Sequence, residues 1–379
     1  MRIGIITLHR AENYGSVLQA YALQKKLEDL GCEAVTLDYH PERYTNKGKM
    51  RRLKDKSTRF NNPLFLLAAQ ILIYPSYIRK NRVFENFISK YLKISEQSFS
   101  DNDEAKKMEF NMDAYCTGSD QVWNSHWNEG VEKALFLDFV PKGKLLFSYA
   151  ASIGLDSIPK EEIELTKNLL GKYESISLRE DTGVKIVEGL GRNDAIQVLD
   201  PTLLLNMYEW DNTLGIGEVK SKYQHYVVTY NLHHDKTIDN YAIALAKKYS
   251  LKVYNISYNW HDVVRKGQLT WCPSVEDFVS LIKHADYVIA DSFHATAFSI
   301  IYKKKFVSII PEIASARLSS LLKITGLEDR LMNSGSNDLS VIERDIDYGR
   351  VNERINREKK KSMDFLRRVV STVNFTHNK

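Results

Sequence analysis

A histidine stands inside an otherwise apolar stretch in the second half of the chain. The segment "DYVIADSFHATAFSII" begins as a short apolar strand pattern, and His294 follows the end of that pattern by a few residues. We expect His294 in the first turn of the next helix, with Ser292 and Thr296 as neighbouring hydroxyl donors. An imidazole in that place could donate a proton to a bound anionic substrate. The alternative is a buried histidine whose ring bonds a backbone carbonyl.

A carboxylate stands in a turn that follows a second strand pattern. In "AYCTGSDQVWNSHW", Asp120 lies between Ser119 and Gln121, directly after the buried run "AYC". Ligands of open α/β sheets bind at the carboxyl ends of strands, so these three residues are candidates for substrate binding. Trp123 and Trp127 could form a platform for sugar rings. An ordinary Asx turn beside core tryptophans would show the same pattern.

Two arginines are candidates for holding an anion. Arg179, in "SLREDTG", ends another strand pattern, and Arg317 lies near the start of a later helix. A guanidinium offers a planar fork of donors that matches carboxylate or phosphate. For Arg179, the alternative is a local ion pair with Glu180 or Asp181.

A polar loop near the N-terminus leads into a helix, in "HRAENYGSVLQAYALQ". The first turn of a helix has unpaired backbone N–H groups that suit an anion or sugar hydroxyls. The candidates here are Asn13, Tyr14, Gly15 and Gln19. The alternative is an Asn cap with a tight turn. With one glycine, the loop lacks the GxGxxG pattern of NAD or FAD sites.

Several kinds of chemistry have no signal in this sequence. The three cysteines, Cys32, Cys116 and Cys272, are widely separated and match neither a zinc site nor a disulfide framework. We expect them to be reduced core residues, and we expect neither a metal nor a bound cofactor. The sequence also lacks an HExxH, a P-loop lysine and a Ser-His-Asp order signal.

Strand and helix patterns alternate along most of the chain. Strand patterns at 3–8 and 34–38 flank a helix whose apolar residues are spaced three and four apart, which predicts a βαβ unit with parallel strands. Further strand patterns end near residue 200, and a second alternation starts at 225. We predict an α/β protein with two Rossmann-like lobes. Its parts are an N-terminal domain (1–200), a C-terminal domain (201–345) and a C-terminal helix (346–379) that could pack back on the first domain.

Residues 47–92 fit neither alternation and are predicted to form a helical insert in the first lobe. The run "KGKMRRLKDKSTR" (47–59) carries seven Lys and Arg against one Asp, a local charge of +6. About 12 apolar residues follow before Pro75. A basic-flanked apolar helix could lie on an anionic membrane surface through residues 47–80. The alternative is a helical hairpin that packs on the first domain.

Charge and hydropathy restrict the partners and the location. Without the basic run the net charge is 5 − 6 = −1, so we expect no nucleic-acid partner. The N-terminal residues lack the pattern of a signal peptide, and no apolar run approaches the roughly 20 residues that span a bilayer. We expect a cytoplasmic protein, either free or peripheral on the inner leaflet of the cytoplasmic membrane.

Six motifs, in this order, resemble the polysaccharide pyruvyl transferase family: "NYGSVLQAYALQ", "TGSDQVWN", "SYAASIG", "SLREDTG", "DPTLLL" and "ADYVIADSFHATAFSIIYKKKF". The resemblance runs from about Arg2 to about Arg330. It implies a GT-B-like fold and transfer of the pyruvyl group of phosphoenolpyruvate to a sugar as a ketal. The sugar would belong to a surface polysaccharide or to its lipid-linked oligosaccharide precursor.

The resemblance also implies catalytic roles for Asp120, Arg179 and His294. Arginines and the helix start at His294 would hold phosphoenolpyruvate, and His294 would protonate its methylene carbon. Asp120 would activate a hydroxyl of a galactose-type sugar. This chain has Ser292 where the family pattern has an arginine, and Arg317 is the candidate replacement.

Two other functions remain open from the sequence. One is a GT-B glycosyltransferase that uses a nucleotide sugar. The other is a non-catalytic sugar-binding or assembly protein.

Overall fold

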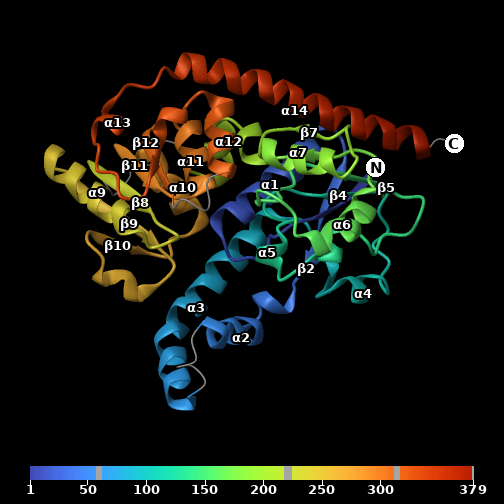
Figure 1. Ribbon diagram of the computed structural model, residues 1–379, viewed down its shortest axis with the longest axis horizontal. Coiled ribbons are helices and arrows are strands. Elements are labelled where there is room, and N and C mark those ends of the chain that lie inside the picture. The colour runs from blue at the N-terminus through green and yellow to red at the C-terminus, as the bar shows by residue number, and fades with distance from the viewer. Residues whose placement is uncertain (57–61, 217–223, 311–315, 378–379) are drawn as a thin grey trace. The chain divides into compact units, whose positions relative to one another are not determined.

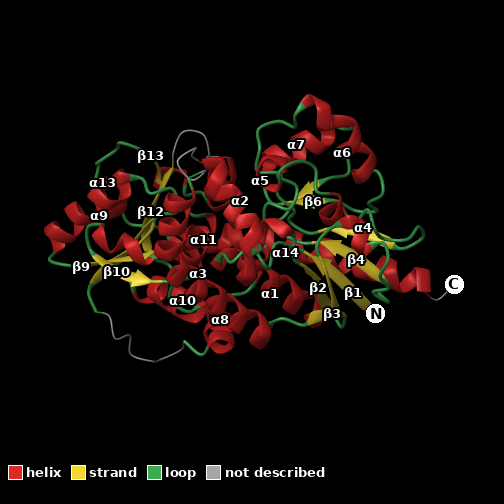
Figure 2. Cartoon of the chain, turned by 90° about the horizontal axis from the view of Figure 1, so that it is seen from below, coloured by secondary structure: helices red, strands yellow, loops and turns green. Residues whose placement is uncertain are grey.

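The computed structural model describes residues 1–56, 62–216, 224–310 and 316–377. The chain forms two compact units. The first contains Met1–Met50, Ile88–Leu204 and Asn356–Lys379, and the second contains Arg51–Phe87 and Leu205–Ile355. Each unit has its own parallel sheet flanked by helices (Figures 1 and 2).

The sheet of the first unit has five parallel strands in the order β3-β2-β1-β4-β5. The predicted βαβ unit is confirmed as β1 (Arg2–Ile6), α1 (Tyr14–Asp29) and β2 (Glu33–Tyr39). Gly31 (φ 83°) allows the chain to turn after α1. The remaining strands of this sheet are β3 (Ile94–Phe99), β4 (Ala114–Thr117) and β5 (Leu145–Ser148).

A short parallel pair continues the first unit beyond β5. It consists of β6 (Ser177–Leu178) and β7 (Ile196–Gln197), and single bridges join Phe147 of β5 to Ser175 and Ala151, just after β5, to Leu178. The other helical elements of this unit are η1 (Glu42–Tyr44), α4 (Asn102–Ala105), α5 (Ser125–Asn128), η3 (Lys133–Phe136), η4 (Lys160–Glu162), α6 (Ile163–Leu170), α7 (Asp181–Gly189) and η5 (Pro201–Leu204).

The sheet of the second unit has six parallel strands in the order β10-β9-β8-β11-β12-β13. Its strands are β8 (Tyr226–Tyr230), β9 (Lys252–Ser257), β10 (Gln268–Trp271), β11 (Tyr287–Ala290), β12 (Lys305–Ile310) and β13 (Leu331–Asn333). Its helical elements are α8 (Met207–Leu214), α9 (Lys236–Tyr249), η6 (Trp260–Val264), α10 (Val275–His284), α11 (Phe293–Ile301), α12 (Ala316–Thr325), η7 (Glu328–Arg330) and α13 (Ser340–Glu343).

The insert predicted at residues 47–92 forms two helices, α2 (Asn46–Lys56) and α3 (Pro63–Tyr91), and α3 continues through Pro75. The structure differs from the expectation of packing on the first domain, because the described part of Arg51–Phe87 clusters with the second unit. Aromatic residues of that unit hold α3. The Trp260 backbone N–H donates to Ser76 Oγ at 2.9 Å, and Arg79 stacks on the Trp271 ring, with its carbon Cζ 4.8 Å from the ring centroid.

The long C-terminal helix α14 (Tyr348–His377) is also divided between the units, at Ile355. Its later part packs against the first unit. Ser362 Oγ accepts a hydrogen bond from the Leu199 backbone N–H at 2.9 Å, and the Phe365 ring lies 6.4 Å from the Tyr149 ring.

The three cysteines are buried and form no disulfide with one another, as the sequence predicted. Burial raises the pKa of the Cys116 thiol well above its ordinary value, so the thiol stays protonated and inert.

Candidate functional site

Asp120 lies just beyond the carboxyl end of β4, in a backbone conformation that L residues rarely adopt. Its φ of 76° is in the left-handed region. Aspartate tolerates this conformation because its short side chain bonds the local backbone: the Gln121 N–H donates to Asp120 Oδ1 at 2.9 Å. Local strain of this kind at a strand end is typical of functional sites.

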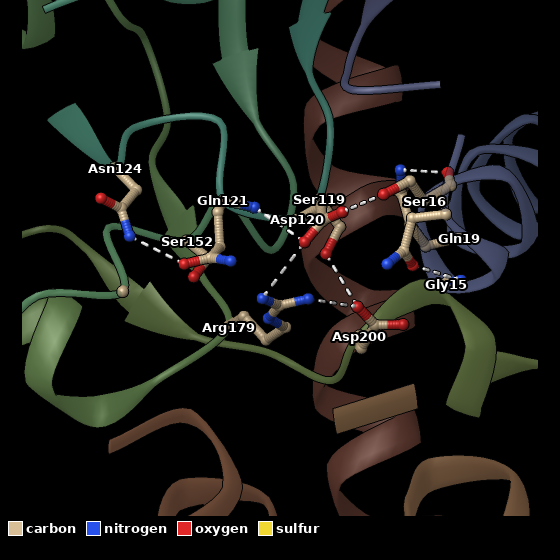
Figure 3. Close-up of polar contacts among 12 residues, drawn as sticks. Gly15, Ser16, Gln19, Ser119, Asp120, Gln121, Asn124, Ser152, Arg179 and Asp200 are labelled. Carbon is tan, nitrogen blue, oxygen red and sulfur yellow. Dashed lines mark hydrogen bonds and ion pairs between the residues drawn. The ribbon is translucent and has the colours of Figure 1, made fainter. Parts of the chain in front are cut away.

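The first turn of α1 brings a hydroxyl to Asp120 (Figure 3). Ser16 Oγ donates to Asp120 Oδ2 at 2.5 Å. The helix begins beside it because Asn13 is the N-cap, and Asn13 Oδ1 accepts the Gly15 N–H at 2.9 Å. Ser16 and Asp120 are 104 positions apart in the chain, and they meet because β1 and β4 are parallel neighbours. Asn13 therefore caps the helix, which was the alternative interpretation in the sequence analysis. A contact of Asn13 or Gly15 with substrate stays a prediction.

Three carboxylates surround the guanidinium of Arg179. Its Nη1 lies 3.2 Å from Asp200 Oδ2, and its Nη2 lies 3.7 Å from Asp120 Oδ1. Its Nε lies 3.9 Å from Glu180 Oε2. Burial alone would lower the pKa of Arg179, but the charges of Asp200, Asp120 and Glu180 outweigh burial and raise it. The cation thus holds Asp120 in place, and its direct contact with a substrate anion stays a prediction.

Hydroxyl and amide donors fix two of these carboxylates from the other side. Asp200 accepts from Ser119 Oγ at 2.9 Å and from Thr202 Oγ1 at 2.7 Å. Glu180 Oε1 accepts from Ser152 Oγ at 2.9 Å. Ser119 was a candidate for substrate binding, and in the structure it orients Asp200. The result is one connected polar network beneath Asp120 (Figure 3).

The other polar candidates of the first unit also have internal partners. Gln19 is buried, and its Nε2 donates to Thr7 Oγ1 at 2.8 Å. Gln121 Oε1 accepts from Asn124 Nδ2 at 2.7 Å, which stiffens the loop after Asp120. Tyr14 is buried in the core. Whether Tyr14, Gln19 or Gln121 also contacts a substrate stays a prediction.

The two tryptophans of the same loop lie in different surroundings. Trp123 is buried and stacks on Phe136, with ring centroids 5.1 Å apart, whereas Trp127 is 52% exposed. Trp123 therefore occupies the core, as its alternative interpretation expected. A contact of Trp123 with a sugar ring stays a prediction.

In the second unit, His294 lies in the first turn of α11, as predicted, and it is buried. Ser292 is the N-cap and accepts the Ala295 N–H at 3.4 Å. Thr296 Oγ1 donates to the Ser292 carbonyl at 3.0 Å and lies 2.7 Å from Ser308 Oγ. These contacts fix the helix start relative to β12, and thereby fix the backbone that carries His294.

A second imidazole, which the sequence analysis missed, lies near this helix start. His233 follows β8, and its Nδ1 lies 2.8 Å from Asp291 Oδ2, at the end of the neighbouring strand β11. The hydrogen bond to Asp291 raises the pKa of His233, while burial and the nearby charge of Arg317 lower it less. Asp291 also accepts the Leu232 N–H at 2.8 Å. The signal that could have found His233 is its place at a strand end, in "VVTYNLHHD".

Arg317 lies within electrostatic range of His233, and both follow carboxyl ends of strands of one sheet. Arg317 is the second residue of α12 and is half-buried. Its charge acts on His233 strongly enough to affect the pKa of the imidazole. A guanidinium and a protonated imidazole at such an edge suit a multiply charged anion.

The candidate residues thus form two groups, one in each unit. Asp120 and Arg179 belong to the first unit, and His294, His233 and Arg317 belong to the second. Action of both groups on one substrate stays a prediction.

The described ranges offer neither a metal-binding cluster nor a membrane-crossing helix. No group of three or more His, Cys, Asp or Glu side chains there is arranged to hold a metal ion. Within the same ranges, no helix combines the length and the apolar character needed to cross a bilayer.

The fold resembles that of sugar-nucleotide enzymes. UDP-N-acetylglucosamine 2-epimerase from Rickettsia bellii aligns over 99% of this chain and 97% of its own, with a TM-score of 0.54 and 12% identity. The Methanocaldococcus jannaschii enzyme, solved with UDP-GlcNAc and UDP, aligns over 98% and 100%, with a TM-score of 0.52 and 12% identity. The predicted fold class is confirmed: this is an α/β protein of the GT-B-like class.

The family follows from the sequence itself. A model of the family described as "Polysaccharide pyruvyl transferase" matches residues 13–312, most of the chain. The chain belongs to the polysaccharide pyruvyl transferase family, as the ordered motifs indicated, and is thus of a transferase class. Among curated protein sequences, none matches this chain.

Proposed function

We propose that this protein transfers the pyruvyl group of phosphoenolpyruvate to a sugar of a surface polysaccharide, or of its precursor, as a cyclic ketal. The observation that carries this proposal is the family match over residues 13–312. The arrangement of charged groups in each unit supports it.

The second unit offers a place for the donor. Phosphoenolpyruvate carries phosphate and carboxylate charges, and His233, Arg317 and the start of α11 are all electropositive. In the family pattern an arginine stands where this chain has Ser292. We propose that His233 and Arg317 together supply the missing positive charge.

The chemical step needs one proton donor and one proton acceptor. His294 gives a proton to the methylene carbon of phosphoenolpyruvate, which leaves an oxocarbenium-like centre at C2. A sugar hydroxyl attacks C2 and passes its proton to Asp120. The bond from C2 to the phosphate oxygen then breaks, and phosphate leaves with the bonding electrons and with the proton that Asp120 accepted. A second hydroxyl of the same sugar attacks C2 and returns a proton to His294, which closes the ketal.

The network of the first unit suits Asp120 for this role. Ser16 and the Gln121 N–H orient its two oxygens, and the charge of Arg179 offsets part of the negative charge of the three carboxylates. Orientation of the acceptor hydroxyl contributes to the rate because the reacting atoms then meet in a productive geometry. The reaction requires Asp120 and His294 to act on the same pair of substrates.

A donor assay tests the proposed function directly. The full-length protein is incubated with a panel of sugars and either phosphoenolpyruvate or UDP-sugars, and released phosphate, released UDP and product masses are measured. We expect phosphate release that depends on the sugar, together with the mass of an added pyruvate ketal. UDP release with no phosphate release would instead identify a glycosyltransferase, and no turnover with either donor would favour a non-catalytic sugar-binding protein.

The charge of His233 predicts a pH-dependent donor affinity. Because Asp291 raises the pKa of His233 above its ordinary 6.5, the imidazolium is present at low pH and is lost as pH rises through the raised value. The charged groups that act on the His233 imidazole are Asp291, Arg317 and Asp235. We expect His233→Asn to raise KM for phosphoenolpyruvate about five- to tenfold at pH 6 and less than about twofold at pH 9, with little change in kcat.

The neighbouring His234 provides the matched control. Its side chain is 52% exposed, and its Nδ1 lies 3.9 Å from Asp262. His234→Asn should leave KM unchanged at both pH values. Equal KM ratios for His233→Asn at pH 6 and pH 9 would show that His233 does not act through its charge.

A further inference from the structure

The N-terminal half of α3 carries an unusual concentration of exposed apolar side chains. Leu64 is 76% exposed, Ile71 67% and Tyr74 61%. The others are Phe65, Leu67, Leu72 and Ile78. No charged residue occurs between positions 64 and 78. Large contiguous apolar surfaces on soluble proteins mark contacts with a partner or a membrane.

These side chains cover a broad arc of the helix. Successive residues of a helix are turned by about 100°, so the seven exposed side chains of residues 64–78 cover roughly half of the circumference of α3. Trp260 of the second unit holds one edge of this arc: its Nε1 donates to the Leu72 carbonyl at 2.5 Å, and its backbone N–H donates to Ser76 Oγ at 2.9 Å. Contact with one partner helix buries a narrower stripe. A broad arc suits a fluid apolar phase.

A second exposed apolar segment follows the residue that contacts α3. Val263 and Val264, in η6, are 60% and 89% exposed. Trp260, at the start of the same element, donates to the Leu72 carbonyl of α3. The second unit therefore exposes apolar side chains on α3 and on the element that holds it. We name the exposed residues of 64–78, with Val263 and Val264, the apolar surface.

The charges next to the apolar surface are positive. In the sequence, the basic run at 47–59 precedes it, with seven Lys and Arg against one Asp. In the same unit as the apolar surface, Arg51 and Arg82 are exposed. Anionic lipid headgroups attract basic residues that flank an apolar segment. The charges thus complement an anionic bilayer.

Other positive residues fix α3 in place. Arg79 Nε donates to the Trp271 carbonyl at 2.9 Å, and Lys80 lies 4.6 Å from the centroid of the Tyr258 ring. The middle of α3 is thereby attached to the second unit, and the N-terminal part that carries the apolar side chains extends away from the strands of that unit (Figure 1). The helix can present this half to a surface without losing its own attachment.

We propose that this protein docks onto an anionic lipid bilayer through the apolar surface. The apolar side chains lie at the boundary between headgroups and acyl chains, and the cations of α2 contact the headgroups. The helix lies along the membrane surface and does not cross it, because the uncharged stretch spans about 22 Å. Docking is independent of the transfer reaction, and it would bring the enzyme to acceptors carried on lipids.

Vesicle flotation of the full-length protein tests this proposal. The vesicles contain phosphatidylcholine with or without phosphatidylglycerol. We compare the wild type with the double variant Leu67→Ser/Ile71→Ser, whose side chains are exposed, so that folding is retained. The matched control is Leu165→Ser/Tyr208→Ser, at exposed apolar side chains outside the apolar surface. Light scattering gives the oligomeric state of each protein, and thermal melting confirms that each is folded.

We expect the wild type to float with the anionic vesicles and to be released by high salt. The Leu67→Ser/Ile71→Ser variant should bind the anionic vesicles at least about tenfold more weakly than the wild type. The control variant should bind them within about twofold of the wild type. Three results would overturn the proposal: no flotation of the wild type, equal flotation of the wild type and the Leu67/Ile71 variant, or equal binding to neutral and anionic vesicles. The proposal would also be overturned if the wild type were a dimer, the Leu67/Ile71 variant a monomer, and neither bound vesicles. A second copy of the chain would then cover the apolar surface.

Phosphate release is measured on the same proteins with a soluble sugar acceptor. Loss of flotation with retained phosphate release would locate the defect in docking. Flotation without phosphate release in the wild type would leave the docking proposal standing and contradict the proposed function.

Discussion

Replacing His294 by glutamine is expected to lower the rate of pyruvyl transfer about 10²–10⁴-fold, the usual contribution of a positioned general acid. Glutamine is similar in size and polarity to histidine but cannot give up a proton to the methylene carbon. His294 is buried in the first turn of α11, whose start is fixed by Ser292 and Thr296. The variant should therefore keep its fold and its affinity for phosphoenolpyruvate while kcat falls.

His284 provides a matched histidine in the same unit. It is the last residue of α10, and its Nδ1 lies 2.9 Å from the Ser280 carbonyl of the same helix. We expect His284→Gln to leave kcat within about twofold of the wild type. Phosphate release and thermal melting are measured for both variants. A His294→Gln enzyme that is folded and keeps more than about a tenth of the wild-type kcat would exclude His294 as the proton donor.

Replacing Arg179 by alanine is expected to lower the free energy of unfolding by about 3–5 kcal/mol. The variant leaves Asp120, Glu180 and Asp200 buried without their shared cation. A buried charge that loses its partner costs far more than an exposed one, since water cannot solvate it. Urea unfolding at pH 7 measures the effect, and activity should be lost as well, because Asp120 loses its orientation.

Two further variants separate charge from general damage. Arg179→Lys keeps the cation but loses the planar fork, so we expect a smaller loss of stability than with alanine. Arg2→Ala removes an exposed pair with Glu33 in the same unit, with side chains 40% and 58% exposed. Its cost should stay below about 1 kcal/mol. A similar small cost for Arg179→Ala would show that the three carboxylates do not depend on this cation.

Local patterns predicted most of the fold and the strand-end positions of the candidate residues. The alternation of apolar strands and amphipathic helices indicated parallel sheets in two parts, and the ordered motifs indicated the family. Three strands at sheet edges were missed, namely β3, β10 and β13. Edge strands are paired on one side only, so they need little apolar periodicity. The sequence "ISEQSF" of β3 shows none.

The partners of the candidate residues could not be predicted, because they come from distant parts of the chain. Ser16 lies 104 positions from Asp120, and His233 lies 58 positions from Asp291. Each pair meets because particular strands become parallel neighbours, a choice that no local pattern encodes. The same reason explains α3, whose Arg79 packs on Trp271, 192 positions away.

The sequence by itself thus determined the type of most elements, the candidate residues at strand ends and the family. Only the tertiary structure decided that Arg179 is surrounded by carboxylates, that His233 pairs with Asp291, and that apolar side chains of one half of α3 are exposed. Periodicity and turn chemistry act over a few residues, whereas the burial and charge of a site depend on which distant segments pack together.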